Sequence, residues 1–293
     1  MNVGKPNLLA SAPAGAVMTE GRLHEILASE TVAYPGTISA IYNVVYLNKP
    51  VLLKVFSGTR TRHTRDFCRW AYGRETLTPK HVSEIADQLG ASVTRLLDYG
   101  LRVTPPLEVW DVADPFAERG SVARALAVTF ERHDAMTVRE HAFALLPQSE
   151  EVLALFEKHL AHVLCAVNAA IRLQAVADYS LGYGFDPKPR NFLLDGGFVY
   201  VDSFPVLYPK IMAAYANRAP SKAFCKRFDI RYYIYDLLMR YFRICPDLYD
   251  ELRDAAFQQI ARCVQQPQDY IYFVDEAIHA YREKWGHLLP DPK

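Results

Sequence analysis

Residues 181–205 read LGYGFDPKPRNFLLDGGFVYVDSFP, and the interpretation of the whole chain starts from this stretch. A short loop carries Asp186, Lys188 and Asn191, and a pattern of two short apolar strands follows it. Asp202 comes directly after the second strand. Carboxylate and amide oxygens are the ligands that magnesium prefers, and a lysine balances the charge of phosphate groups. The stretch therefore predicts a site for phosphate and metal.

The composition is that of a globular protein without a strong overall charge. Of the 293 residues, 51% are hydrophobic and 23% are charged, and 33 basic residues balance 33 acidic ones. A formal net charge of zero offers no general attraction for nucleic acid or for an anionic membrane surface. No apolar run reaches the length that a membrane-spanning helix needs. We therefore expect no nucleic-acid partner and no membrane span.

The cysteines and histidines form no recognisable metal or nucleophile motif. The five cysteines are scattered without a CxxC pair, which excludes the common zinc and redox motifs. An odd number of separated thiols is typical of a reducing compartment, so we expect a cytoplasmic protein. No HExxH pattern and no GxSxG elbow is present. The 181–205 stretch remains the candidate site.

The chain changes character near residue 134. Residues 1–20 are expected to form a flexible leader. Strand-forming residues dominate 31–56, where two turn signals predict three strands, and 125–130 forms another apolar strand. Beyond residue 137 apolar residues recur at helical spacing instead. The sequence thus predicts an α+β fold with two lobes, a strand-rich one and a larger helical one.

We expect the lobes to span residues 21–134 and 135–293, with a hinge at 131–134. Within the first lobe, helices are predicted over 66–75 and 79–89, the second ending at Gly90. The segments VTRLLDYG and LEVWDVA are then expected to form a hairpin. The basic run TRTRHTR is interpreted as a solvated loop, with a dock for an anionic substrate as the alternative.

Lys54 lies in the apolar strand VLLKVF and needs a partner, because burying an unpaired ammonium is costly. One interpretation is an edge-strand lysine whose charge reaches solvent. The other is an ion pair that positions phosphate groups, with Glu84 as the favoured partner and Glu75 of the neighbouring helix as the alternative.

At this point the motifs resemble those of a known superfamily. GFDPKPRNFLL resembles the catalytic loop of protein-kinase-like enzymes, H-R-D-L-K-P-x-N, and VLLKVF resembles their V-A-I-K strand. Asp202 resembles the metal-binding aspartate of D-F-G, and Asp229 resembles the helix aspartate that braces the catalytic loop. The resemblance implies a two-lobed kinase-like fold that uses ATP and Mg²⁺.

The resemblance also implies residue roles. Asp186 and Lys188 would be catalytic, Asn191 and Asp202 would bind magnesium, and Lys54 with Glu84 would position the nucleotide phosphates. The glycine-rich loop is reduced to PGTISAIY, where Gly36, Thr37 and Ser39 are expected to face phosphate. The hinge backbone around Glu131 and His133 would bind adenine.

Four functions remain open from the sequence, and one of them is a helical binding protein outside the kinases in which the loop motif is coincidental. The interval from Asp202 to Asp229 is short and has no clear A-P-E motif, which resembles aminoglycoside, choline or lipopolysaccharide-sugar kinases. We therefore expect a transferase that phosphorylates a hydroxyl of a small molecule, such as a metabolite, sugar or antibiotic. A protein Ser/Thr kinase is the first alternative. A pseudokinase that binds a nucleotide or a partner is the second, because Gly184-Phe185 replaces the usual His-Arg.

Overall fold

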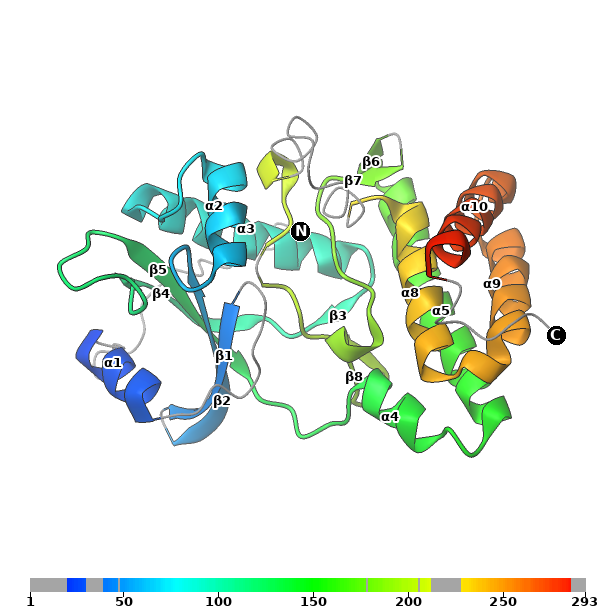
Figure 1. The fold of residues 1–293 in the computed structure, drawn as a ribbon, viewed down its shortest axis with the longest axis horizontal. Coiled ribbons are helices and arrows are strands. Elements are labelled where there is room, and N and C mark those ends of the chain that lie inside the picture. The colour runs from blue at the N-terminus through cyan, green and yellow to red at the C-terminus, as the bar shows by residue number, and fades with distance from the viewer. Residues whose placement is uncertain are drawn as a thin grey trace, which may run out of the picture. The chain divides into compact units, whose positions relative to one another are not determined.

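The protein is described by a computed structural model that covers residues 20–29, 39–46, 48–177, 179–204, 206–211 and 228–285. The chain divides into two compact units, and Figure 1 shows the elements of each. The first unit comprises Met1–Val93, Thr104–Asp134 and Phe204–Val206. The second comprises Thr94–Val103, Ala135–Ser203 and Leu207–Lys293.

Helices and strands alternate early in the chain, and helices dominate later. The helices are α1 (Glu20–Ser29), α2 (Arg62–Tyr72), α3 (Pro79–Asp98), α4 (Val138–Ala144), α5 (Ser149–Arg172), η1 (Pro189–Asn191), α8 (Ile230–Ile244), η2 (Pro246–Leu248), α9 (Tyr249–Cys263) and α10 (Pro267–Trp285). The strands are β1 (Ser39–Tyr46), β2 (Lys49–Ser57), β3 (Arg102–Val103), β4 (Pro106–Ala113), β5 (Arg124–Glu131), β6 (Val176–Ala177), β7 (Ser180–Leu181), β8 (Phe192–Leu194) and β9 (Phe198–Tyr200). The predicted α+β fold, strand-rich first and helical later, is confirmed.

The first unit is built on an antiparallel sheet with the strand order β1-β2-β5-β4. Alternate residues of a strand point to opposite faces. On one face, Val51, Leu53 and Val55 of β2 pack in a core with Leu23 and Ile26 of α1. This alternation fixes the direction of Lys54, which shares the opposite face with Phe56.

That opposite face of the sheet is covered by helix α2. The Phe56 ring meets the Phe67 ring of α2 edge to face, with centroids 5.6 Å apart. Phe204 contacts Phe56 in the same way at 6.0 Å. Lys54 is therefore an interior residue of a central strand, only 4% exposed, and the edge-strand interpretation is wrong.

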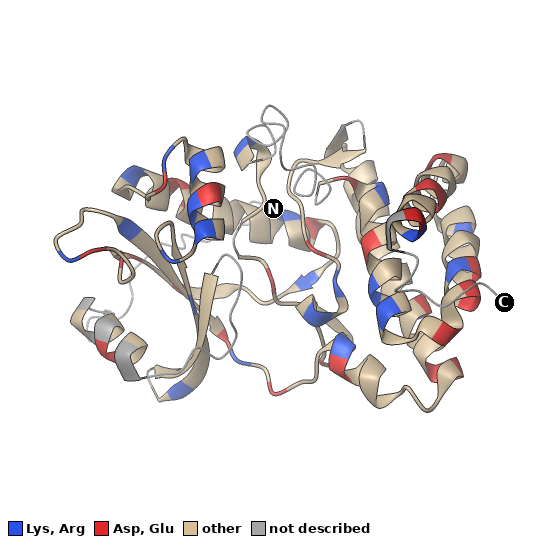
Figure 2. Ribbon diagram, viewed as in Figure 1, with Lys and Arg blue, Asp and Glu red and all other residues tan. Residues whose placement is uncertain are grey.

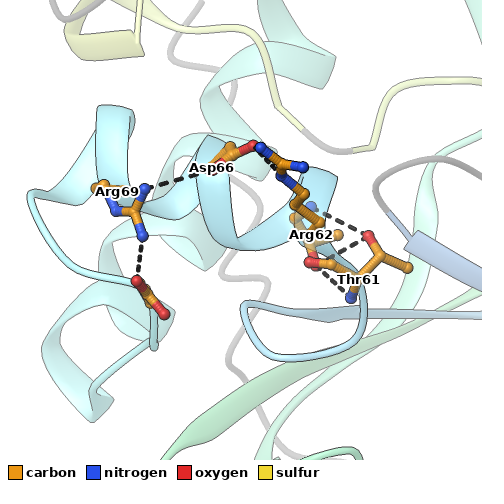
Figure 3. A network of polar contacts seen from close by, with 6 residues as sticks. Thr61, Arg62, Asp66 and Arg69 are labelled. Carbon is orange, nitrogen blue, oxygen red and sulfur yellow. Dashed lines mark hydrogen bonds and ion pairs between the residues drawn. The ribbon is translucent and has the colours of Figure 1, made fainter.

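The basic run at residues 59–65 is not a solvated loop, because most of it starts α2. Thr61 caps the helix: its hydroxyl accepts a hydrogen bond from the Thr64 backbone nitrogen, and its own backbone nitrogen donates one to the Thr64 hydroxyl. Arg62 and Arg69 lie on either side of Asp66 and form ion pairs with it (Figure 3). A reciprocal cap of this kind satisfies N–H groups at the start of the helix. The segment is therefore helical despite its run of basic residues.

Helix α3 continues through the predicted stop at Gly90 and ends at Asp98. Its buried face, Val82, Ile85 and Leu89, carries on into Val93 and Leu96 at helical spacing. Gly90 costs only about 1 kcal/mol within a helix, which packing offsets. The actual stop is Gly100, which has a φ of 82° and donates to Leu97 while Leu101 donates to Leu96.

This extension of α3 also makes the predicted hairpin wrong. VTRLLDYG ends α3 instead of forming a strand, and the long antiparallel partner of β4 is β5. The first of the three strands expected in residues 31–56 would lie before residue 39, outside the described residues, as does nearly all of the expected leader.

The second unit is mostly helical. Helix α5 packs against α8 and α9, and α10 packs against α8 and α9. Figure 2 shows acidic and basic residues interleaved along α9 and α10, in keeping with the balanced composition. A small sheet with the order β3-β9-β8 lies in the same unit and carries the residues of the candidate site.

Within the described part of the chain, α5 alone is long and apolar enough in composition to span a membrane. No uninterrupted apolar run of spanning length occurs in it, and the expectation of no membrane span stays a prediction. Phe156, Leu160, Val163, Leu164 and Val167 are nonetheless buried against the rest of the unit. This burial is what the core helix of a globular unit requires.

Candidate functional site

The loop of residues 185–191 brings its three polar side chains together. Lys188 Nζ lies 2.5 Å from Asp186 Oδ2, and both residues are at least nine-tenths buried. Pro189 begins the short helix η1, whose geometry returns the Asn191 backbone nitrogen to the Lys188 carbonyl at 2.8 Å. The Asn191 amide nitrogen also donates to the Asp186 carbonyl oxygen at 3.2 Å. The loop is thus closed on itself.

The β8–β9 hairpin brings Asp202 back to this loop. Gly197 permits the tight turn with a φ of 135°, a value that side chains strongly disfavour. The backbone nitrogen of Val201 then donates to the Asn191 carbonyl at 3.0 Å. Asp202 follows directly, so the predicted two-strand pattern is confirmed and returns Asp202 to the 185–191 loop.

Tyr200 links the two aspartates through a single hydroxyl group. Its oxygen accepts a hydrogen bond from the Asp186 backbone nitrogen at 3.0 Å and donates to the Asp202 carbonyl at 2.8 Å. Burial, followed by the charges of Asp202 and Asp186, raises the pKa of Tyr200 well above its usual value. The hydroxyl therefore keeps its proton and its donor role at any physiological pH.

A second tyrosine holds the loop from the other side. The backbone nitrogen of Phe185 donates to the Tyr233 hydroxyl of α8 at 3.0 Å. Burial raises the pKa of Tyr233 well above its usual value as well. The bracing role expected for Asp229 is thus provided by Tyr233, because the Asp229 carboxylate instead caps α8 and binds the Arg231 guanidinium.

Negative and positive side chains alternate around Lys188, each beside one of opposite charge. Lys188 Nζ lies 2.5 Å from Asp186 and 4.0 Å from Asp236 Oδ2. Asp236 Oδ1 in turn accepts a hydrogen bond from Arg240 at 3.2 Å. Two carboxylates and two cations therefore balance in a largely buried place, where an unpaired charge would be costly.

Asn191 and Asp202 carry oxygen donors of the kind that magnesium takes from proteins, and their role as its ligands stays a prediction. The amide nitrogen of Asn191 is held by the Asp186 carbonyl, so its oxygen faces away from that bond. Among the described residues, no cluster of three or more His, Cys, Asp or Glu side chains is placed to hold a metal. One carboxylate and one amide suit magnesium, which usually takes its other ligands from phosphate and water.

The first unit contains the residues predicted to bind the nucleotide. Lys54 projects from β2, and its Nζ lies 5.1 Å from the centroid of the Phe130 ring. Glu84 lies half-buried on α3. Helix α2 ends at Tyr72, so Glu75 lies outside it, although the sequence predicted a helix up to residue 75. Glu75 is exposed and pairs with Arg69. These positions favour Glu84 over Glu75, and its ion pair with Lys54 stays a prediction.

The remaining predicted nucleotide-binding residues are placed as follows. Ser39 begins β1 and is buried, whereas Glu131 ends β5 and is exposed. His133 follows, and its Nε2 lies 3.1 Å from the Thr104 hydroxyl. Gly36 and Thr37 lie outside the described residues. The roles assigned to these five residues stay predictions.

Sequence reasoning missed four residues of the site: Tyr200, Tyr233, Asp236 and Arg240. The last three recur on α8 at the spacing of one helical face. This periodicity was the available signal, but tyrosines at helical spacing are more typical of a core. Only the hydrogen bonds to the 185–191 loop distinguish the two interpretations.

No model of a known protein family matches the chain, and no curated protein matches it. The solved structures that are similar to the chain include two of the PknI kinase domain from Mycobacterium tuberculosis. One is 17% identical, covers 88% of this chain and 96% of that one, and gives a TM-score of 0.40. A cysteine-to-alanine variant is 16% identical, covers 85% and 94%, and gives 0.42. Both matches are distant in sequence.

Proposed function

We propose that the chain is an ATP- and magnesium-dependent phosphotransferase that acts on a hydroxyl group of a small molecule. The observation that carries this proposal is the 185–191 loop. Asp186 is buried beside Lys188 at 2.5 Å, and Asn191 is bonded to the Asp186 carbonyl. Phosphoryl transfer mainly requires such positioned charges rather than covalent chemistry by the protein.

Asp186 acts on the acceptor. Its carboxylate orients the hydroxyl and takes its proton as the oxygen bonds to the γ-phosphorus and the bond to the departing ADP breaks. Lys188 balances the negative charge that gathers beside Asp186. Tyr200 and Tyr233 hold the loop backbone still, so that little reorganisation is needed during transfer.

Lys54 and Glu84 of the first unit act on the nucleotide phosphates. Asn191 and Asp202 would hold the magnesium ion through one amide and one carboxylate oxygen. When bound, magnesium neutralises the charge that develops on the phosphate oxygens. Ser39 and the backbone at Glu131 and His133 complete the proposed nucleotide contacts.

A small-molecule acceptor is favoured over a peptide. Protein kinases use a long segment after their metal-binding aspartate to hold a peptide, and the interval from Asp202 to Asp229 is short. The expected acceptor is a hydroxylated metabolite, sugar or antibiotic.

The test is transfer of phosphate from ATP to a panel of hydroxylated metabolites, with magnesium, followed by ADP release and product mass. Changing Asp186→Asn should lower turnover roughly 100- to 10,000-fold, because the positioned base is lost. Asp254→Asn is the matched control, since Asp254 is an exposed aspartate on α9.

Equal turnover in the wild-type chain and in Asp186→Asn would contradict the proposed role of Asp186. If neither protein transfers phosphate while ATP still raises the melting temperature, the chain binds nucleotide without catalysis and the transferase proposal fails.

A further inference from the structure

A pocket of about 190 Å³ opens beside Asp186 within the second unit. This volume is enough for a small polar group or several water molecules. Residues of the 185–191 loop form one side and α8 forms the other. Its lining is Asp186, Pro187, Lys188, Tyr232, Tyr233, Asp236 and Arg240.

The carboxylate and ammonium groups of this pocket are already paired with one another. Asp236 is 7% exposed, and its two oxygens face Arg240 at 3.2 Å and Lys188 at 4.0 Å. Asp186 accepts from Lys188 at 2.5 Å. A cationic ligand would therefore have to compete with internal cations for both carboxylates.

Arg240 differs because most of its donors have no hydrogen-bond partner among the described residues. A guanidinium carries five N–H groups, and one hydrogen bond is formed, to Asp236. Its Nε is buried without a hydrogen-bond partner in the described structure, although its side chain as a whole is 36% exposed. A buried donor without a partner is destabilising, so a group that accepts its hydrogen bond is favoured there.

We propose that Arg240 binds an anionic group of the acceptor, a phosphate or a carboxylate, while the reacting hydroxyl lies at Asp186. The planar guanidinium matches both anions with paired hydrogen bonds. The inference rests on the proposed function and narrows its acceptor to hydroxylated anions. The rings of Tyr232 and Tyr233 line the same pocket and offer apolar surface to the carbon chain of such a molecule.

The test measures binding without ATP, by calorimetry on the full chain, so that it does not depend on turnover. The probes are glycerol 1-phosphate, glycerate, glycerol and ethanolamine, which differ mainly in charge. The two anions should bind tighter than glycerol and ethanolamine, and their affinities show whether phosphate or carboxylate is preferred. Arg240→Gln should weaken the preferred anion about tenfold or more, because charge-assisted hydrogen bonds are lost.

Arg243→Gln is the matched control, because this arginine lies on the same helix, is exposed and bonds to Tyr281 outside the pocket. It should leave binding unchanged. Arg240→Lys keeps the positive charge without the planar guanidinium. Its affinity for the anion should lie between those of the wild type and Arg240→Gln. This variant also keeps a cation beside Asp236 if Arg240→Gln does not fold.

The outcomes separate this inference from the proposed function. Asp186→Asn should lower transfer roughly 100- to 10,000-fold and keep anion binding. Anion binding without any transfer in the wild-type chain overturns the function alone. Equal affinity for glycerol and the anions, or anion binding that is indifferent to both Arg240 variants, overturns the Arg240 site alone. Tighter binding of ethanolamine than of the anions would also overturn it.

Discussion

The hydroxyl groups of Tyr200 and Tyr233 hold two successive backbone nitrogens, those of Asp186 and Phe185. Both hydrogen bonds are buried. Without the tyrosine oxygens, each N–H group would lose its partner in a water-poor place, at about 1–3 kcal/mol. The position of the Asp186 carboxylate therefore depends on two side chains that lie outside the 185–191 loop.

Changing Tyr233→Phe should lower the free energy of unfolding by about 1–2 kcal/mol, because the Phe185 N–H is left unsatisfied while the ring still packs. It should also lower kcat, with little effect on the KM for ATP. Urea denaturation and steady-state kinetics measure these effects. Tyr272→Phe is the control, since Tyr272 is 70% exposed, and comparable losses there would contradict the assignment.

How far the site could be predicted depends on distance along the chain. Asp186, Lys188, Asn191 and Asp202 lie on one loop and one hairpin, so their meeting follows from local turns. Asp236 reaches Lys188 from a helix almost fifty residues later. Its placement depends on how α8 packs, which no local pattern encodes.

At the scale of elements, α5 buries a histidine among aromatic rings. His159 stacks on Phe198 with ring centroids 5.1 Å apart and lies 4.7 Å from the Phe192 ring. The Tyr241 hydroxyl lies 3.4 Å from its Nδ1, and its Nε2 has no hydrogen-bond partner in the described structure. Burial, and then the neighbouring His162, lowers the pKa of His159 to about 3.

This histidine should make stability depend on pH. The unfolded chain protonates His159 below about pH 6.5, whereas the folded chain resists protonation down to about pH 3. Its contribution to stability is therefore complete above pH 6.5 and is lost as the pH falls towards 3. At pH 5 the free energy of unfolding should have dropped by about 2 kcal/mol from this group.

Chemical denaturation of the wild-type chain and of His159→Phe between pH 7 and pH 5 measures the difference. The variant should lose less stability over this range. His63→Phe, at an exposed position on α2, should behave like the wild type. Parallel losses in all three proteins would show that His159 is not the group responsible.

Helix α3 shows why elements were predicted better than their ends. Its apolar spacing predicts a helix, but the glycine at position 90 suggests an end that the helix does not have. The capping pattern that ends a helix needs a particular backbone turn, and here that turn occurs at Gly100. The pairing of β4 with β5 was missed for the related reason that strand partners are chosen through a distant segment.

At the scale of the whole molecule, the residues proposed to bind the nucleotide and the acceptor belong to different units. Lys54 lies in the first unit, and Asp186 and Asp202 lie in the second. The order of strand-rich and helical halves was predictable, because residue periodicity reports each element type directly. The role proposed for each unit follows from which of these side chains it carries.

Nucleotide binding should stabilise the whole chain. ATP with magnesium at about 100 times its Kd should raise the free energy of unfolding by about 2.7 kcal/mol, seen as a higher Tm. Lys54→Met should remove most of this gain, because the phosphates lose their cation. Asp186→Asn should retain it, since the role proposed for Asp186 is on the acceptor.

Lys80→Met is the control for Lys54→Met, because Lys80 is exposed at the start of α3. A nucleotide shift that survives in Lys54→Met would remove Lys54 from the site. A shift that disappears in Asp186→Asn would mean that Asp186 serves the nucleotide instead of the acceptor.

Helix α8 holds the 185–191 loop through Tyr233 and lines the acceptor pocket through Asp236 and Arg240. Inserting or deleting one residue between these positions would rotate the following side chains by about 100° around the helix axis. Such a change would alter the pocket only by also displacing a residue of α8 that contacts the 185–191 loop. Relatives with other acceptors should therefore differ by substitution at positions 232, 236 and 240, and keep the length of this helix segment.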